Sequence, residues 1–183
     1  VAILAEGDPL FYSSFMYLHD RLAPAYDVEI IPGITSISGS SAVAAQAISR
    51  HEDVLTVLPG TLPKHELARR LADTEAAVIM KLGKHYPAVI EALREAGRLD
   101  EAIYVERATH ESQRVASAAE VDPASVPYFS QIIVPGIDRR ADFAGRAGLP
   151  VIVEDPHPRM NRRPPTRSQK IDVGFQRPRM VGG

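Results

Sequence analysis

Two apolar runs near the start of the chain each end in a turn of Gly, Pro and small polar residues, and a helix-like run follows each turn. Val1–Ala5 leads into Glu6–Pro9, and Val28–Ile31 leads into Pro32–Ser36. Short apolar runs bounded by turn residues predict buried β-strands. The sequence therefore predicts an α/β fold in which both turns lie at the carboxyl edge of a parallel sheet, where open α/β folds bind ligands.

The residue types in these turns suit both tight backbone geometry and ligand contact. Gly7 and Gly33 permit positive φ and the close approach of a ligand to the backbone. Thr35 and Ser36 offer hydroxyls at a helix start, either as N-caps or as ligand contacts. Asp8 has two interpretations that the sequence leaves open: an N-cap for a helix that begins at Pro9, or a carboxylate that faces a cleft.

The remaining chain repeats the alternation of strands and helices, which is typical of a layered α/β domain. Apolar periodicity predicts helices over 9–22, 36–46, 64–71 and 86–96, the last ended by Gly97, and strands over 54–58, 76–82, 102–106 and 128–134. The predicted organisation is the remainder of an amino-terminal α/β domain over 1–50, a carboxy-terminal α/β domain over 51–136, and a Pro/Arg-rich tail over 137–183.

Composition narrows the function classes. The tail holds ten basic and five acidic residues and six of the fifteen prolines, so we expect it to be disordered. It lacks interleaved aromatic residues, which argues against a nucleic-acid role. The chain has no cysteine and no apolar run of ~18 residues, so disulfides, thiolate metal sites and a membrane span are not expected. Its histidines show no metal-ligand spacing. The default is a cytoplasmic protein without a metal.

An ordered series of motifs resembles the tetrapyrrole (corrin/porphyrin) methylase family, and within it the precorrin-2 C20-methyltransferases. The resemblance covers residues 1–136, and these segments carry it: Ala5–Pro9, Tyr12–Tyr17, Ile31–Ser36, Ser49–Glu52, Val57–Gly60, Ile79–Gly83 and Tyr104–Thr109. It implies two α/β domains of the tetrapyrrole methylase type, the second with a mixed sheet, and S-adenosylmethionine bound between them. It also implies a homodimer.

The resemblance also assigns residues to the cofactor. The implied cofactor-binding set consists of Glu6, Gly7, Asp8, Phe11, Thr35, Ser36, Met80, Ala108, Pro135 and Gly136. Several of these would act through backbone atoms, and capping, turn or core roles remain open for Glu6, Thr35, Ser36 and Met80.

The implied acceptor is a meso carbon of precorrin-2, a reduced tetrapyrrole that carries many carboxylates. Arg50, Lys81 and Arg107 are candidates to bind these anions, with surface salt bridges as the alternative for each. Tyr12 and Tyr17 could stack on the macrocycle or lie at the edge of the core. Because attack by carbon leaves a proton to be removed, Asp8 is the candidate catalytic base.

The implied reaction converts precorrin-2 to precorrin-3A, and the sequence does not separate this substrate from cobalt-precorrin-2. Val1 already lies in a predicted strand, and the resemblance implies a preceding strand with a Gly-x-Gly-Pro-Gly turn that is missing here. A different hypothesis therefore stays open: a non-catalytic remnant that acts only as a binding module. For a chain that lacks one wall of the cleft we expect weak or no binding of S-adenosylhomocysteine.

Overall fold

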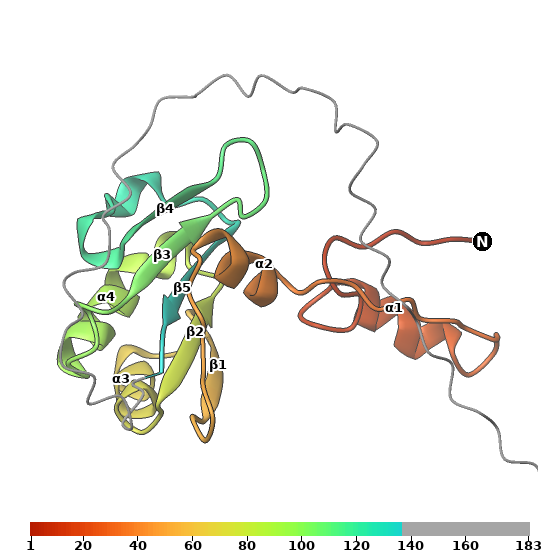
Figure 1. The fold of residues 1–183 in the computed structure, drawn as a ribbon. Helices are drawn as coiled ribbons and strands as arrows, with labels where there is room; N and C mark the ends of the chain where they lie inside the picture. The colour runs from red at the N-terminus through yellow and green to blue at the C-terminus, as the bar shows by residue number, and fades with distance from the viewer. Residues whose placement is uncertain (137–183) are drawn as a thin grey trace, which may run out of the picture. The chain divides into compact units, whose positions relative to one another are not determined.

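The computed structural model describes residues 1–136, and the predicted tail over 137–183 lies outside the described residues. The described residues contain one five-stranded mixed sheet with the strand order β1-β2-β5-β3-β4 (Figure 1). The strands are β1 (Leu55–Pro59), β2 (Ala76–Met80), β3 (Ile103–Glu106), β4 (Arg114–Ser117) and β5 (Ser130–Val134). β1 and β2 are parallel, whereas β5 is antiparallel to both β2 and β3, and β4 is antiparallel to β3.

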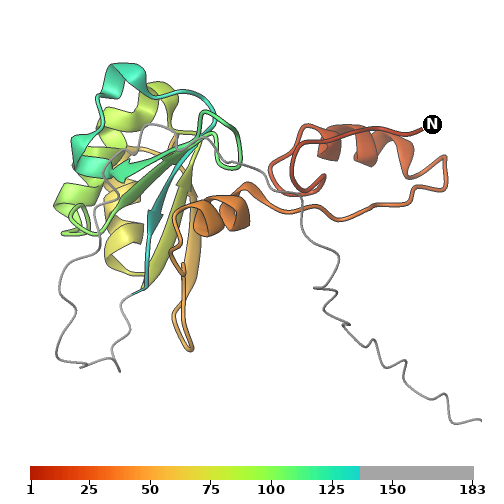
Figure 2. The ribbon, with the colours of Figure 1, turned by 45° about the horizontal axis from the view of Figure 1, so that its top comes forward.

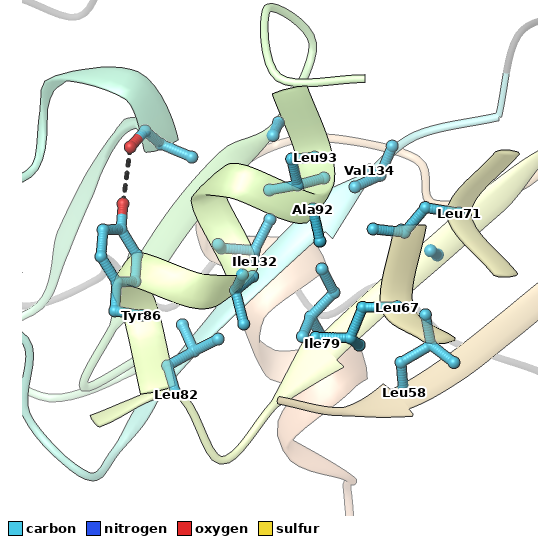
Figure 3. Packing of buried hydrophobic residues seen from close by; sticks show 14 of the residues in the cluster. Leu58, Leu67, Leu71, Ile79, Leu82, Tyr86, Ala92, Leu93, Ile132 and Val134 are labelled. Carbon is cyan, nitrogen blue, oxygen red and sulfur yellow. Dashed lines mark hydrogen bonds between the residues drawn. The ribbon is translucent and has the colours of Figure 1, made fainter. Parts of the chain in front are cut away.

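Two amphipathic helices, α3 (Lys64–Ala72) and α4 (Tyr86–Glu95), cover one face of the sheet (Figures 1 and 2). Figure 3 shows their apolar side chains packed onto alternate residues of the central strands, such as Leu67 of α3 and Ile79 of β2. Both side chains are fully buried. Burial of each such side chain contributes about 1.5–3 kcal/mol to folding, so this layer is the main core of the described residues.

Helix α4 ends as its sequence predicts. Gly97 has a φ of +69°, and its N–H donates to the Arg94 carbonyl at 3.1 Å, while the Arg98 N–H donates to the Leu93 carbonyl at 2.8 Å. These two bonds form a Schellman motif, which needs a residue in the left-handed region at the position of Gly97.

Helix α2 (Ser36–Val43) lies on the opposite face of the sheet, where it contacts β5 and β3 (Figure 2). Val78, Val105 and Ile133 on this face are at most 1% exposed. Serine, glycine and alanine make up much of α2, and small side chains let a helix approach a sheet closely. On α2, Ile37 and Ser40 are buried.

The amino-terminal segment differs from the prediction. Val1–Ala5 and Val28–Ile31 do not form strands, because no described segment pairs with them and a strand needs a neighbour's N–H and C=O groups. The predicted helix over 9–22 is shortened to α1 (Phe15–Leu22). Asp8 is therefore not the cap of this helix, whose first turn starts after Ser14. Strand β4 was not predicted; it is a short edge strand whose first two residues are exposed and whose last two are half-buried.

Candidate functional site

The two predicted turns do meet, and Asp8 joins them. Its Oδ2 accepts a hydrogen bond from the Gly33 N–H at 3.1 Å, and its Oδ1 accepts from the Leu10 N–H at 2.9 Å. Gly7 has a φ of +71°. A Cβ on Gly33 would overlap the Gly7 carbonyl oxygen, so the approach of the two loops requires glycine there. We call the residues Gly7–Asp8 and Gly33–Ile34 the loop junction.

The second loop leads directly into α2, and Thr35 caps this helix. The Thr35 Oγ1 accepts from the Ser38 N–H at 3.3 Å, as an N-cap hydroxyl does. Ser36 is exposed at the first helical position. The cap role considered for Thr35 is therefore confirmed, whereas a ligand role for either hydroxyl stays a prediction. Glu6 is exposed and Phe11 is half-buried within the same segment.

The carboxyl ends of β2 and β3 form a second group of candidate residues. Met80 is the last residue of β2 and Glu106 the last of β3, and because both strands are antiparallel to β5, their carboxyl ends lie at one edge of the sheet. Lys81, Arg107 and Ala108 follow these strands directly. We call this edge the carboxyl edge. It contains a shallow pocket lined by Thr61, Lys81, Leu82, Gly83, Lys84, His85 and Tyr128.

Three of the five candidate substrate-binding residues have a backbone that side chains rarely tolerate. The φ angles of Tyr12, Lys81 and Arg107 are +54°, +57° and +45°. Each such residue costs on the order of 1–3 kcal/mol, and strained residues of this kind cluster at binding and catalytic sites. The Lys81 Nζ also lies 5.0 Å from the centre of the Tyr12 ring. This cation–π contact joins two of the three residues.

The buried residues Tyr104 and Glu106 hold the exposed side chain of Arg107. Its guanidinium donates to Glu106 at 3.2 Å, and the Tyr104 hydroxyl donates to the other Glu106 oxygen at 2.6 Å. The Arg107 N–H donates to the Phe129 carbonyl at 2.9 Å, which ties the end of β3 to the start of β5. Burial, together with the hydrogen bond to Glu106, raises the pKa of Tyr104 well above its ordinary value. Tyr104 therefore stays protonated at neutral pH and donates to the Glu106 carboxylate.

Three predicted residues lie at the opposite edge of the sheet. Val134 pairs with Ala77 near the amino end of β2, so Pro135 and Gly136 lie a strand's length from Met80 and Ala108. The Gly136 N–H donates to the Ile48 carbonyl at 2.8 Å. The Arg50 N–H donates to Asp53, whose carboxylate lies against Gly136. The structure thus gathers Arg50, Pro135 and Gly136 at one edge and does not bring them to the other candidates.

The remaining predicted residue, Tyr17, lies on α1 and is 71% exposed. An aromatic pair that was not among the predicted site residues precedes β5 at the carboxyl edge. Tyr128 and Phe129 are 72% and 63% exposed, with ring centres 5.2 Å apart in an edge-to-face arrangement. Two adjacent aromatic residues before a strand are a usable signal, because contiguous exposed apolar side chains mark binding surfaces more often than single ones do.

Residues 1–136 contain no cluster of three or more His, Asp and Glu side chains that could hold a metal ion. Among the helices of the same residues, none is long and apolar enough to cross a bilayer.

Comparison with known proteins decides the family. Residues 1–122 match the Tetrapyrrole (Corrin/Porphyrin) Methylases. The chain belongs to this family. It is 56% identical over 149 residues to the cobalamin biosynthesis protein CobIJ of Mycobacterium bovis, covering 81% of this chain and 29% of that protein. It is 54% identical over 136 residues to a precorrin-2 C(20)-methyltransferase of Sinorhizobium sp, covering 74% of this chain and 56% of that protein.

A solved member of the same fold is the uroporphyrin-III C-methyltransferase of Thermus thermophilus, whose crystal structure contains S-adenosylhomocysteine. The two structures agree with a TM-score of 0.53 at 20% identity, over 70% of this chain and 62% of that one. This likeness supports the α/β fold. The chain spans about a third to about half the length of the two curated relatives above.

Proposed function

We propose that this chain is part of an S-adenosylmethionine-dependent C-methyltransferase of corrin biosynthesis, which methylates precorrin-2 at C20 to give precorrin-3A. One observation carries the proposal: the 54% identity over 136 residues to a relative named for this reaction. The loop junction and the carboxyl edge supply what the reaction needs, namely backbone groups, cations and aromatic rings around a nucleoside and a flat anionic acceptor.

The residues at the carboxyl edge fit an adenosyl group. Met80 and Ala108 are only partly buried, and the buried Oε1 of Gln131, level with Met80, has no hydrogen-bond partner in residues 1–136. A polar atom left in this state favours a bound polar ligand. We propose that Met80 and the backbone at Ala108 hold the adenosyl group, and that the loop junction holds the amino-acid end. The binding roles of Glu6, Phe11, Thr35 and Ser36 remain proposals. So do those of Pro135 and Gly136, although these two residues lie at the opposite edge of the sheet from Met80.

When bound, the sulfonium supplies a methyl group that is already activated, so the protein mainly positions the reactants and excludes water. Lys81 and Arg107 are proposed to bind acceptor carboxylates, with Tyr12 against the macrocycle. Asp8 is the proposed base for the proton that leaves the methylated carbon. Both its oxygens already accept a backbone N–H, which fixes the carboxylate and leaves a further lone pair on each oxygen.

The test is an assay of the full-length gene product with S-adenosylmethionine and either precorrin-2 or cobalt-precorrin-2. We expect one added methyl group on the metal-free substrate, read by mass spectrometry. Binding of S-adenosylhomocysteine without product from either substrate would favour the non-catalytic binding module instead. If only cobalt-precorrin-2 gave a methylated product, the proposed substrate would change and the proposed reaction would stand. We also propose a homodimer that acts in the cytoplasm, and analytical ultracentrifugation tests its assembly.

A further inference from the structure

One buried side-chain polar atom in residues 1–136 lacks a hydrogen-bond partner: the Oε1 of Gln131 on β5. Gln131 is 7% exposed. Several other buried polar side chains in the same part of the chain are paired. For example, the Tyr86 hydroxyl donates to the Ala118 carbonyl at 2.6 Å, the bond drawn in Figure 3, and the Thr74 hydroxyl donates to the Val54 carbonyl at 2.9 Å. A buried oxygen without a donor is costly, so this exception needs an explanation.

The strand register places Gln131 at the carboxyl edge. Gln131 pairs with Val105 of β3 on one side. On the other side, Ile132 pairs with Ile79, so the next step of the antiparallel register brings Gln131 level with Met80. Residues that face each other across antiparallel strands have side chains on the same face. The Gln131 amide therefore lies between the Met80 and Val105 positions.

The face that carries Gln131 is the one on which α2 lies. Ile132 and Val134 belong to the core under α3 and α4, so the alternate residues Gln131 and Ile133 point to the other side. Val78, Val105 and Ile133 on this face are apolar, so a leucine at position 131 would pack against them without burying a polar group. At ordinary precision the oxygen and nitrogen of an amide are interchangeable, but either assignment leaves one polar end buried without a partner.

We propose that the Gln131 amide binds the nucleoside of the methyl donor, its Oε1 accepting a hydrogen bond from an N–H or O–H of that nucleoside. The proposal rests on the proposed function, since it takes the adenosyl group to lie beside Met80. It adds a side-chain contact to a subsite otherwise built from backbone atoms and Met80. A ligand of this kind supplies the donor that the protein itself does not.

The experiment compares the full-length gene product with its Gln131→Leu and Gln131→Met variants. Two probes are titrated by calorimetry: S-adenosylhomocysteine, and methylthioadenosine, which keeps the nucleoside but lacks the amino-acid end. We expect each substitution to lower the affinity for both probes by about tenfold, which is the effect of losing one hydrogen bond to a ligand. The unliganded variants should be as stable as the parent or more stable, because they lose a buried unpaired oxygen. Gln46→Leu, at a half-buried glutamine whose amide donates to the neighbouring Ala47 carbonyl, is the matched control and should change neither quantity.

Each outcome separates the two proposals. If the parent binds neither probe, the proposed function fails, and the role of Gln131 fails with it. If the parent binds and both variants bind equally well, the inference about Gln131 is overturned while the proposed function stands. If the variants lost affinity for S-adenosylhomocysteine but not for methylthioadenosine, the assignment of Gln131 to the nucleoside would be overturned. Variants that lose stability and affinity together at Leu and at Met would indicate a structural role and would also overturn it.

Discussion

Two short runs that the sequence predicts as strands adopt different structures in this protein. Ala76–Met80 becomes β2, an interior strand of the sheet, in which Ala76, Ala77, Val78 and Ile79 are fully buried. Val28–Ile31 stays without a strand partner, and Ile31 is 70% exposed. The difference shows that an apolar run specifies a strand only where neighbouring strands satisfy its backbone and other side chains cover its faces. The sheet is therefore expected to carry the stability of the described residues, and the amino-terminal segment little of it.

The largest effect is expected from a substitution in the buried core of the sheet. Ile79→Ala removes three carbons from a fully buried site between β2 and the helix layer, and should lower the free energy of unfolding by about 2–5 kcal/mol. Ile34→Ala, at a side chain that is 75% exposed in the amino-terminal segment, should change it by less than about 0.5 kcal/mol. Urea denaturation measures both. Equal losses would mean that the amino-terminal segment is packed as tightly as the sheet.

The buried Arg98, which follows α4, links the end of α3 to the edge of the sheet where β2 begins and β5 ends. The Arg98 guanidinium donates to the carbonyls of Thr74 and Glu75 at 2.8 Å and to those of Leu71 and Pro135 at 3.3 Å, and it pairs with Glu101. Arg98→Met would remove the donor that these carbonyls share and should lower the free energy of unfolding by about 3 kcal/mol, measured by urea denaturation. Arg94→Met, at an exposed position of α4, is the control and should cost almost nothing. A small loss at Arg98 would show that water replaces the guanidinium.

Two buried tyrosines, Tyr86 and Tyr104, make the stability of the core depend on pH in the alkaline range. Burial raises the pKa of Tyr86 to about 12, and burial with the Glu106 bond raises that of Tyr104 further. Because the unfolded chain releases these protons near pH 10, the folded state binds more protons above that pH, and stability must fall as pH rises. The expected slope is about 1.4 kcal/mol per pH unit for each tyrosine.

The variant Tyr86→Phe sharpens the alkaline test. At pH 7 it should cost about 1 kcal/mol, because it removes the bond to the Ala118 carbonyl. At pH 11 the difference from the parent should shrink, since the variant has one tyrosine fewer to keep protonated. A difference that stays constant from pH 7 to pH 11 would mean that Tyr86 ionises as easily when folded as when unfolded.

The smallest effects concern two glycines outside the sheet. Gly33→Ala should open the loop junction, since its Cβ would overlap the Gly7 carbonyl, and hydrogen exchange of the Gly33 and Leu10 amides should speed up without a change in global stability. Gly39→Ala has room beside Thr109 and should stabilise α2 by up to about 1 kcal/mol. A loss of global stability at Gly33 would show that the loop junction belongs to the same cooperative unit as the sheet.

Much of the fold follows from local patterns. The periodicity of residues 64–71 and 86–96, the capping glycine at Gly97 and the apolar run over 76–82 predict α3, α4 and β2 within one or two residues. Strand β4 could not be predicted, because its residues become a strand only by pairing with the edge of β3. The meeting of the two Gly/Pro loops was predicted, but the Asp8–Gly33 bond that joins them spans 25 residues, a distance at which periodicity carries no information.

The sequence by itself determined the family, the alternation of strands and helices, and the types of residue around a ligand edge, because each depends on motifs or on neighbours within a few positions. Tertiary structure alone decided which candidates share an edge. It placed Met80, Lys81 and Arg107 together and Pro135 and Gly136 at the other end, because β5 runs antiparallel to its neighbours. It also left the Gln131 oxygen unpaired, since a side chain's hydrogen-bond partners depend on strands that are distant in the chain.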